Sequence, residues 1–266
     1  DLGGKRMGIL YAGIVLLATT VGAVSGIGGG VIIKPVLDAI GYHTIADIGF
    51  LSSCSVFAMA LVSSYKQIRQ GVRFDYRVLL FASAGAVAGG FAGNTLFTLT
   101  GEALGEAFTG VLQSSLLALM TALVFLYILL QKRAKGLKLK NPLAMAAAGL
   151  VLGTVSSFLG IGGGPFNVAV FMLFFGMDMK MSTVYSVAVI IFSQLSNLTT
   201  LFVNTGFQGY DARFLVYMIP AAVLGGYIGA RLNRKLSERA ISVLFNLVLL
   251  FIIGLNLYNV AAALPF

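Results

Sequence analysis

The pentapeptide Gly-Ile-Gly-Gly-Gly stands at residues 26–30, inside a long apolar region, and the same five residues return at 160–164. A short apolar stretch follows each copy, at residues 31–41 and 165–177, and neither reaches the about 20 residues that a helix needs to cross a bilayer. Glycine weakens a helix because it has no side chain to restrict its backbone. Each pentapeptide therefore predicts a break between a long helix and a short one.

Eight other apolar segments are each near the length of a membrane-spanning helix. The chain is 58% hydrophobic and 10% charged, whereas about 25% of the residues of a soluble domain are charged. The net charge of +9 does not indicate a nucleic-acid partner, because the basic residues lie between apolar runs. We therefore expect an all-α polytopic membrane protein in a lipid bilayer, with spans near residues 7–25, 45–65, 76–99, 103–130, 143–159, 182–203, 214–230 and 241–260.

A second repeated pattern shows that the duplication extends beyond the pentapeptides. Ala-Val-x-Gly-Gly-x-x-Gly-x-x-Leu occurs at residues 86–96 and again at 222–232. We therefore predict two fused repeats, each with a long helix, a glycine break, a short half-helix and three further helices. The first transmembrane repeat covers residues 1–131, a basic cytoplasmic linker 132–141, and the second repeat 142–266.

The distribution of basic residues predicts how the repeats are oriented, because loops rich in Lys and Arg face the cytoplasm. The basic loop at 66–77 corresponds to 204–213, which has one basic residue, and the loop with Glu102 and Glu106 corresponds to the basic loop at 231–239. This swapped bias predicts inverted-topology repeats. Inversion requires an odd number of crossings per repeat, so we count each short helix as a crossing, ten in all. The alternative is that the short segments re-enter on one side, which would leave four crossings per repeat in a parallel arrangement and place the basic cluster at 231–239 outside. The basic residues are Lys66, Arg69, Arg73 and Arg77, then Lys132, Arg133, Lys135, Lys138 and Lys140, then Arg231, Arg234, Lys235 and Arg239.

The glycine breaks are the first candidates for a binding site. Non-helical backbone at membrane depth is tolerated only where protein buries it or water reaches it. The first turn of each short helix offers unpaired N–H groups and the positive end of a helix dipole, which suit an anion. Glycine lets backbone approach a ligand closely. The candidate substrate-binding residues in the breaks are Gly28, Gly29 and Gly30 in the first repeat and Gly162, Gly163 and Gly164 in the second.

Lys34 lies four residues after Gly30, near the start of the first short helix. A buried cation needs a partner. Helical side chains lean toward the N-terminus, so the ammonium group can reach back over the glycines. Its partner is either a transported anion or Asp38, one turn further along. The second repeat has Val168 at this position and offers Asn167 one residue earlier, so the site would be asymmetric.

Polar residues at helical spacing follow the short segments. Ser52 in the first repeat corresponds to Ser186 in the second, where Gln194 and Asn197 also lie on the stripe or at its edge. These four residues are candidates for lining a polar path. The alternative is that small polar residues let helices pack closely, and we assign that packing role to the glycines near residues 85–93 and 225–229.

Metal and cofactor chemistry has few candidate residues here. Cys54 is the only cysteine and His43 the only histidine, so we expect no metal site, no cofactor and no disulfide within the chain. An intramembrane enzyme with Ser25 as nucleophile and His43 as base is a remote alternative. For a coupling proton, the candidates near the short helices are Asp38, His43, Asp47 and Asp178.

The doubled pentapeptide, each copy followed by an apolar half-helix, resembles the TauE/SafE family of membrane transporters, also called sulfite exporters. The first copy matches the family pattern of a glycine cluster followed by a proline, here Pro35. The second copy departs from it, with Pro165 directly after the glycines and Ala169 where Pro35 would align. The resemblance implies movement of sulfite, sulfonates or other small anions.

The combined prediction is a secondary transporter, not an enzyme, in the cell (inner) membrane. It binds a small sulfur-containing oxyanion between the two glycine breaks and exposes it alternately to the two sides. A passive anion channel is the main alternative, because it would share the half-helices. Two further partners are left open: a coupling proton or sodium ion, and a second copy of the chain in a homodimer.

Overall fold

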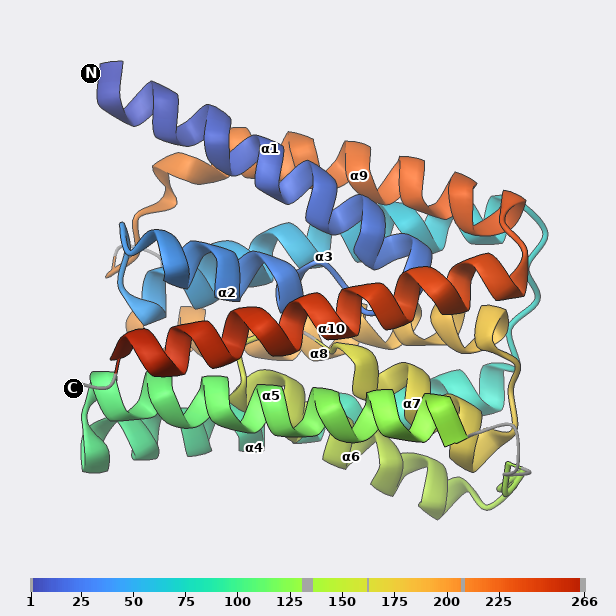
Figure 1. The fold of residues 1–266 in the computed structure, drawn as a ribbon. Coiled ribbons are helices and arrows are strands. Elements are labelled where there is room, and N and C mark those ends of the chain that lie inside the picture. The colour runs from blue at the N-terminus through green and yellow to red at the C-terminus, as the bar shows by residue number, and fades with distance from the viewer. Residues whose placement is uncertain (1, 131–135, 162, 207–208, 264–266) are drawn as a thin grey trace.

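A computed structural model describes the whole chain except residues 1, 131–135, 162, 207–208 and 264–266. The described part is a bundle of α-helices lying roughly side by side (Figure 1). Most helices begin and end where the sequence supplies a cap. The helices are α1 (Leu2–Ser25), α2 (Gly30–Ile40), α3 (Ile45–Arg69), α4 (Tyr76–Leu104), α5 (Glu106–Leu130), α6 (Pro142–Phe158), α7 (Pro165–Phe175), α8 (Met179–Thr205), α9 (Leu215–Lys235) and α10 (Glu238–Ala263), with a short 3₁₀ turn η3 (Ala212–Phe214) before α9.

Side-chain caps fix the start of four helices. Each capping side chain accepts a hydrogen bond from a backbone N–H of the first turn, which has no acceptor inside the helix. Both short helices end on a glycine in the left-handed conformation, which lets the chain turn sharply. The N-caps are Thr44, Asp75, Asn141 and Asp178, and the glycines are Gly41 and Gly176.

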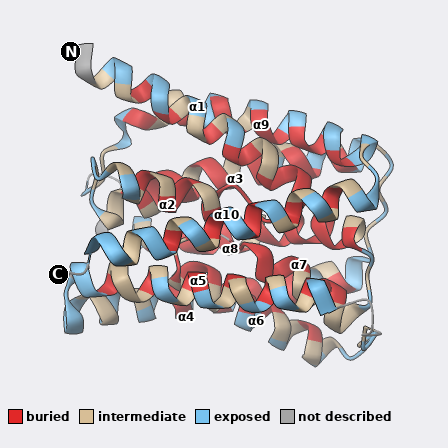
Figure 2. Ribbon diagram, in the orientation of Figure 1, coloured by how far each residue is buried: buried red, intermediate tan, exposed pale blue. Residues whose placement is uncertain are grey.

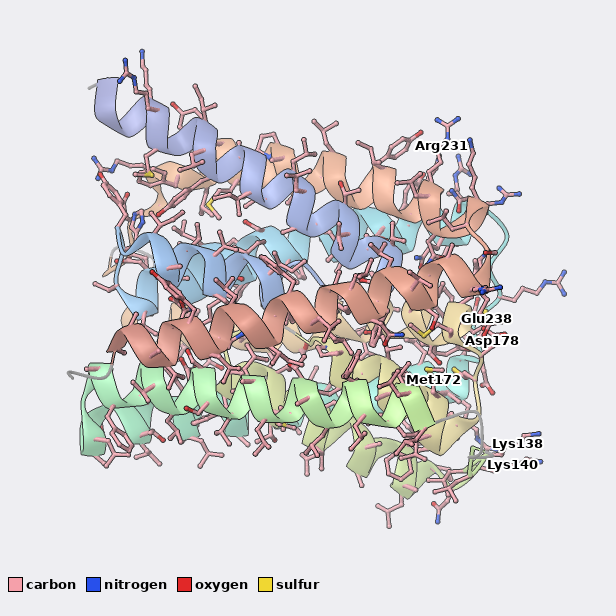
Figure 3. All side chains as sticks on the ribbon, viewed as in Figure 1. Lys138, Lys140, Met172, Asp178, Arg231 and Glu238 are labelled. Atoms are coloured by element: carbon pink, nitrogen blue, oxygen red, sulfur yellow. The ribbon has the colours of Figure 1, made fainter. Side chains whose placement is uncertain are left out.

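The molecule has two chemically different ends. The basic end carries the turns after α3, α7 and α9 and the described part of the linker before α6, and its labelled lysines and arginine lie together on one side of Figure 3. Lys138 and Lys140 line a surface pocket with Arg77 there. The opposite end carries the turns after α2 and α4, the end of α8, the start of α1 and the end of α10 (Figure 1). The sequence-based grouping of the basic loops is consistent with this arrangement, although 132–135 lies outside the described residues.

The expectation of ten crossings is wrong, because neither short helix continues across the bundle. α1 starts at the opposite end and α2 returns to it, where Asp38 lies near Tyr258 at the end of α10. α6 starts at the basic end and α7 returns there, where the Gly176 backbone contacts Gly136. Each half is therefore a re-entrant helix pair followed by three helices that run from end to end. Three crossings are also an odd number, and α3–α5 and α8–α10 begin at opposite ends (Figure 1).

The outer surface of the helix bundle is apolar and is suited to contact lipid. Within the described residues, seven helices are long and apolar enough to span a membrane, and Leu and Phe side chains are exposed along them. Exposed residues cover the outward faces of α5 and α10, while buried residues gather toward the middle (Figure 2). A soluble protein would bury most of this apolar surface, so the exposed faces mark the contact with lipid.

Glycines make the close helix contacts that we predicted for them, and the structure shows that these contacts join the two halves. α4 packs along α6, and α9 packs along α1. A Cβ atom at Gly89 would lie 2.1 Å from the Leu150 carbonyl oxygen, and one at Gly225 would lie 2.1 Å from Thr19 Oγ1. These distances leave no room for a side chain, so the packing role assigned to these glycines is confirmed.

Candidate functional site

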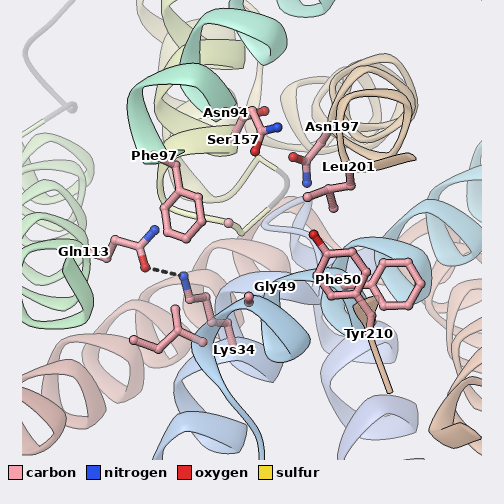
Figure 4. Close-up of a pocket in the computed structure, with 13 residues that line it drawn as sticks. Lys34, Gly49, Phe50, Asn94, Phe97, Gln113, Ser157, Asn197, Leu201 and Tyr210 are labelled. Atoms are coloured by element: carbon pink, nitrogen blue, oxygen red, sulfur yellow. Dashed lines mark hydrogen bonds between the residues drawn. The ribbon is translucent and has the colours of Figure 1, made fainter. Parts of the chain in front are cut away.

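A polar pocket lies between the two halves, toward the opposite end (Figure 4). Its cavity volume is about 40 Å³, and it receives residues from both re-entrant pairs and from the long helices around them. Phe50 and Tyr210 stack at its outer rim with ring centroids 4.7 Å apart. Gly49, which has open space beside it, and Gly160 also line the pocket. Its polar lining includes Lys34 on α2, Asn94 on α4, Gln113 on α5, Ser157 on α6 and Asn197 on α8.

Lys34 is the charged group of this pocket, and its residue is only 5% exposed. Its Nζ donates a hydrogen bond of 2.6 Å to Gln113 Oε1 and one of 2.9 Å to the Leu159 carbonyl oxygen. Both acceptors are neutral, and neither ion pair recorded among the described residues includes Lys34. An ammonium group has three N–H donors, so one of them has no recorded acceptor in the described part of the chain.

The predicted alternative of an ion pair between Lys34 and Asp38 does not form in this structure. The two residues are one helical turn apart on α2, but their charged atoms are not within ion-pair distance. Lys34 turns instead toward the carbonyl just before the second glycine break. A Cβ atom at Gly160 would lie 3.0 Å from its Nζ, so glycine makes room for the ammonium group.

Amide groups surround the ammonium group. Gln113 is only 4% exposed; its Oε1 accepts from Lys34 while its Nε2 donates to the Phe158 carbonyl oxygen. Asn197 Nδ2 donates to Ser53 Oγ at 2.8 Å, which orients its amide. Asn94 and Asn197 both point toward the space above Lys34 in Figure 4. A buried cation among neutral amides is an arrangement that attracts and orients an anion.

Gly160 lines the pocket, whereas the other described glycines of the two breaks that we predicted to bind substrate meet in the core. A Cβ atom at Gly30 would lie 2.2 Å from the Ile161 carbonyl oxygen, and one at Gly164 would lie 2.9 Å from Val31 Cγ2. Gly28 and Gly163 both face the side chain of Ile190, which is fully buried. The glycines thus allow two backbones to touch. Gly29, whose Cβ would lie 2.8 Å from Thr19 Cγ2, caps α2 in the same packed region.

The other predicted site residues divide between the core and the pocket. Ser52 lies beside Gly30 in the core, and Asn167 lies beside Gly163. Ser186 Oγ donates to the Gly26 carbonyl oxygen and so has a structural partner. Of the predicted residues, Lys34 and Asn197 line the pocket. Gln194 is buried with no recorded partner for its Oε1, and Gly162 lies outside the described residues.

Three polar pocket residues escaped the sequence-based prediction: Asn94, Gln113 and Ser157. Asn94 follows the glycine pattern of α4, and Gln113 is an amide within an apolar segment, which is a rare and costly placement in a membrane helix. That cost was the available signal. Ser157 lies three residues before Gly160 and is one small polar residue among many, so nothing in the sequence distinguishes it.

The proposed pairing of Ser25 and His43 in an enzyme does not form. Ser25 Oγ donates to the Val21 carbonyl oxygen at the inner end of α1. His43 lies at the opposite end, where its Nδ1 is 3.0 Å from Tyr11 Oη and its Nε2 is 3.6 Å from Asp211 Oδ2. Among the residues that the structure describes, no group of three His, Cys, Asp or Glu side chains could hold a metal ion.

Apolar helices enclosing a polar pocket, with two re-entrant pairs meeting in the core, define the architecture of a membrane transporter. A family model described as sulfite exporter TauE/SafE matches residues 11–257. The chain therefore belongs to the TauE/SafE family.

Two similar proteins have names that agree with this class. The chain is 25% identical to the probable membrane transporter protein MamO of Magnetospirillum gryphiswaldense, over 92% of this chain but only 45% of MamO. It is 22% identical to the probable membrane transporter protein YunE of Bacillus subtilis, over 89% of this chain and 92% of YunE. The chain thus spans about half the length of MamO and most of YunE. No solved structure matches it.

Proposed function

We propose that this protein is a secondary transporter that binds a small sulfur-containing oxyanion, such as sulfite or a sulfonate, in the pocket beside Lys34. The observation that carries the proposal is the buried ammonium group with two neutral acceptors and no carboxylate in contact among the described residues. A buried cation is costly without a counter-charge. A bound anion supplies that charge, and sulfur is the element that the family description names.

The lining chemistry supports an oxyanion rather than a halide. An oxyanion has several oxygen acceptors pointing in different directions, and the pocket offers donors from several helices. Lys34 contributes an N–H from α2, while Asn94 and Asn197 contribute amide groups from α4 and α8. Each charge-assisted hydrogen bond is stronger than a neutral one, so the ammonium group would supply the largest single contribution.

Comparison of repeat-equivalent positions supports alternating access. In the alignment of the two pentapeptides, Gly160 corresponds to Gly26 and Gly49 to Thr183. Gly160 and Gly49 line the open pocket, whereas a Cβ atom at Gly26 would lie 2.4 Å from Thr183 Cα. One site is therefore open where its equivalent is closed. If the halves exchange these arrangements, the pocket opens toward the basic end instead.

A side-chain contact closes the basic end. Asn233, in the last turns of α9, donates from Nδ2 to the Val24 carbonyl oxygen at 2.6 Å and to Thr183 Oγ1 at 3.0 Å. These bonds tie the end of α1 to the start of α8. We call Asn233, Val24 and Thr183 the inner contact, and infer that it breaks when the pocket opens inward.

The distribution of charge supports an orientation in the membrane. The basic end faces the cytoplasm by the excess of Lys and Arg in its loops, so the open pocket faces outward. The protein would then lie in the cell (inner) membrane. The repeats would be inverted, since their long helices begin at opposite ends (Figure 1).

Binding and transport of sulfite test the proposal. Lys34→Gln keeps a side chain of similar length but removes the charge, and it will weaken sulfite binding by about 10- to 100-fold, the worth of one hydrogen bond to a charged group. Lys34→Arg will retain part of the affinity. Lys5→Gln removes an exposed charge near the same end and will leave the affinity unchanged. Equal sulfite affinity in Lys34→Gln and the wild type would reject this site.

Thermal-shift measurements identify the preferred anion. Sulfite, sulfate, thiosulfate and sulfonates are added to the purified protein, and the one that binds most tightly will raise the melting temperature most. Reconstituted vesicles then separate a carrier from a channel. A carrier shows saturable flux of labelled sulfite that unlabelled sulfite on the far side accelerates, whereas flux that never saturates would indicate a channel.

A further inference from the structure

A second pocket adjoins the first at the opposite end, and it contains a carboxylate. Asp38 lines this space of about 440 Å³ together with His43, Tyr258 and Asn259. The two pockets share Ile45 and Gln113, and Gln113 is the residue that holds Lys34. Lys34 and Asp38 thus line two pockets that have Gln113 in common.

The Asp38 carboxyl group lacks the partners of a buried ionised carboxylate. Its Oδ1 is buried and has no hydrogen-bond donor among the described residues. An ionised carboxylate accepts hydrogen bonds at both oxygens when it is buried, because losing water is otherwise costly. A carboxyl group in this position is suited to gain and lose a proton.

Its position on α2 couples that proton to the anion site. Asp38 follows Lys34 by four residues, so the two side chains lie on one face of α2, with Cβ atoms about 5–6 Å apart. The Asp38 carboxyl group lies one helical turn from the ammonium group without forming an ion pair with it. An anion bound at Lys34 brings a second negative charge to the same cation, and a nearby negative charge favours the protonated form of a carboxyl group.

The other titratable groups that line the pocket beside Asp38 are His43 and Tyr258. From the turn before α3 comes His43, which contacts Tyr11 of α1 and Asp211. From α10 comes Tyr258, while the α5 residues that line the pocket are Ala107, Gly110, Val111, Gln113 and Ser114, none of which is titratable. The residues from α3 are Ile45 and Ile48. Lys34 lies on the same helix as Asp38, and in the proposed site it is the charged group that gains a new partner when the anion binds.

We propose that Asp38 is the proton site of this transporter and that it takes up one proton from the outer solution when the anion binds beside Lys34. This inference rests on the proposed anion site. The carried species is then one anion with one proton, and an inward proton gradient drives accumulation of the anion. At equilibrium, one coupled proton raises the accumulation ratio about tenfold for each pH unit across the membrane.

The test uses labelled sulfite and the full chain in vesicles. Two quantities are measured: sulfite exchange without a pH gradient, and accumulation with the outer solution one pH unit more acidic. Asp38→Asn has nearly the same shape as a protonated Asp38 and cannot release a proton. It will accumulate about tenfold less sulfite than the wild type under the gradient, while still exchanging sulfite. Protonation of sulfite itself contributes equally to both proteins, because both meet the same solutions.

Control variants separate Asp38 from other acidic and basic groups. Glu102→Gln removes an exposed carboxylate at the same end and will accumulate sulfite as the wild type does. His43→Gln will retain the response to the pH gradient. A melting curve shows that each variant is folded.

Several results would overturn the inference. These are an unchanged pH response in Asp38→Asn, a lost response in His43→Gln, or accumulation that follows a sodium gradient instead. Loss of exchange by folded Asp38→Asn would also overturn it, because Asp38 would then belong to the anion site. Failure of the proposed function looks different: the wild type itself would show no sulfite exchange.

Discussion

The inner contact gives a prediction whose size follows from the structure. Asn233 is 3% exposed, and its Nδ2 makes the two hydrogen bonds that join α9 to α1 and α8. Each such bond contributes about 1 kcal/mol net to the state that contains it. Asn233→Ala removes both and so disfavours the outward-open state by about 2 kcal/mol. That change shifts the ratio of outward-open to inward-open molecules by about 30-fold.

Two variants, each with a single introduced cysteine, report the shift between the outward-open and inward-open states. Both carry Cys54→Ala, because Cys54 is the only natural cysteine and would otherwise react as well. Gly49→Cys lies in the open pocket, where no atom stands within 4 Å of the new Cβ. Gln67→Cys lies near the basic end of α3, where Gln67 is 2% exposed and neither polar side-chain atom has a recorded partner. A membrane-impermeant thiol reagent is added from each side. Asn233→Ala will slow labelling at residue 49 and accelerate labelling at residue 67, by up to about 30-fold.

A matched variant controls for the loss of a buried amide. Asn256 is 1% exposed, but its Nδ2 donates to the Ile252 carbonyl oxygen within its own helix. Asn256→Ala will therefore leave the balance between the two labelling rates unchanged. If folded Asn233→Ala labels like its parent at both positions, the inner contact does not open during transport. Faster labelling at both positions would indicate a loosened fold and would contradict the reasoning equally.

Two further predictions concern stability. Gly89→Ala will lower the melting temperature, because its Cβ would lie 2.1 Å from a carbonyl oxygen of α6. Gly254→Ala will leave the melting temperature unchanged, because no atom lies within 4 Å of the new Cβ. Thermal melts followed by circular dichroism distinguish the two variants, and equal melting temperatures would contradict the packing role. At the opposite end, the hydrogen bond from Arg213 lowers the pKa of Asp211 to about 2. The Asp211 contribution to stability is therefore present above its unfolded pKa of about 4 and is lost as the pH falls toward 2. The difference in melting temperature between the wild type and Arg213→Ala should shrink over that range, and a constant difference would show that the pair does not act through this carboxyl group.

Several features of the fold could be predicted because they depend on neighbouring residues. Runs of apolar residues predict long helices at any position in the chain, since lipid requires each helix to satisfy its own backbone. The doubled pentapeptide predicted both breaks, and the repeated glycines at Gly89 and Gly225 predicted close helix contacts. Caps such as Thr44 and Asp178 are likewise local, because they act within one helical turn.

The count of crossings could not be predicted in the same way. Length indicates that α1 can span a bilayer, but its end meets Thr183 and the chain then turns back along α2. The direction of the chain after a glycine depends on what packs against it. The swapped charges of the loops required only an odd number of crossings, and both three and five satisfy that condition.

The sequence by itself determined that this chain is a polytopic membrane protein with two glycine-broken helices, and it predicted that Lys34 is a buried charge in need of a partner. Only the tertiary structure decided which partner it has: Gln113, 79 positions away, and the Leu159 carbonyl oxygen, 125 positions away. It also decided that the glycines meet in the core while the pocket forms around the lysine. The physical reason is that helix formation and breaking depend on residues within a turn or two, whereas a buried polar group takes its partners from whichever distant helices pack against it.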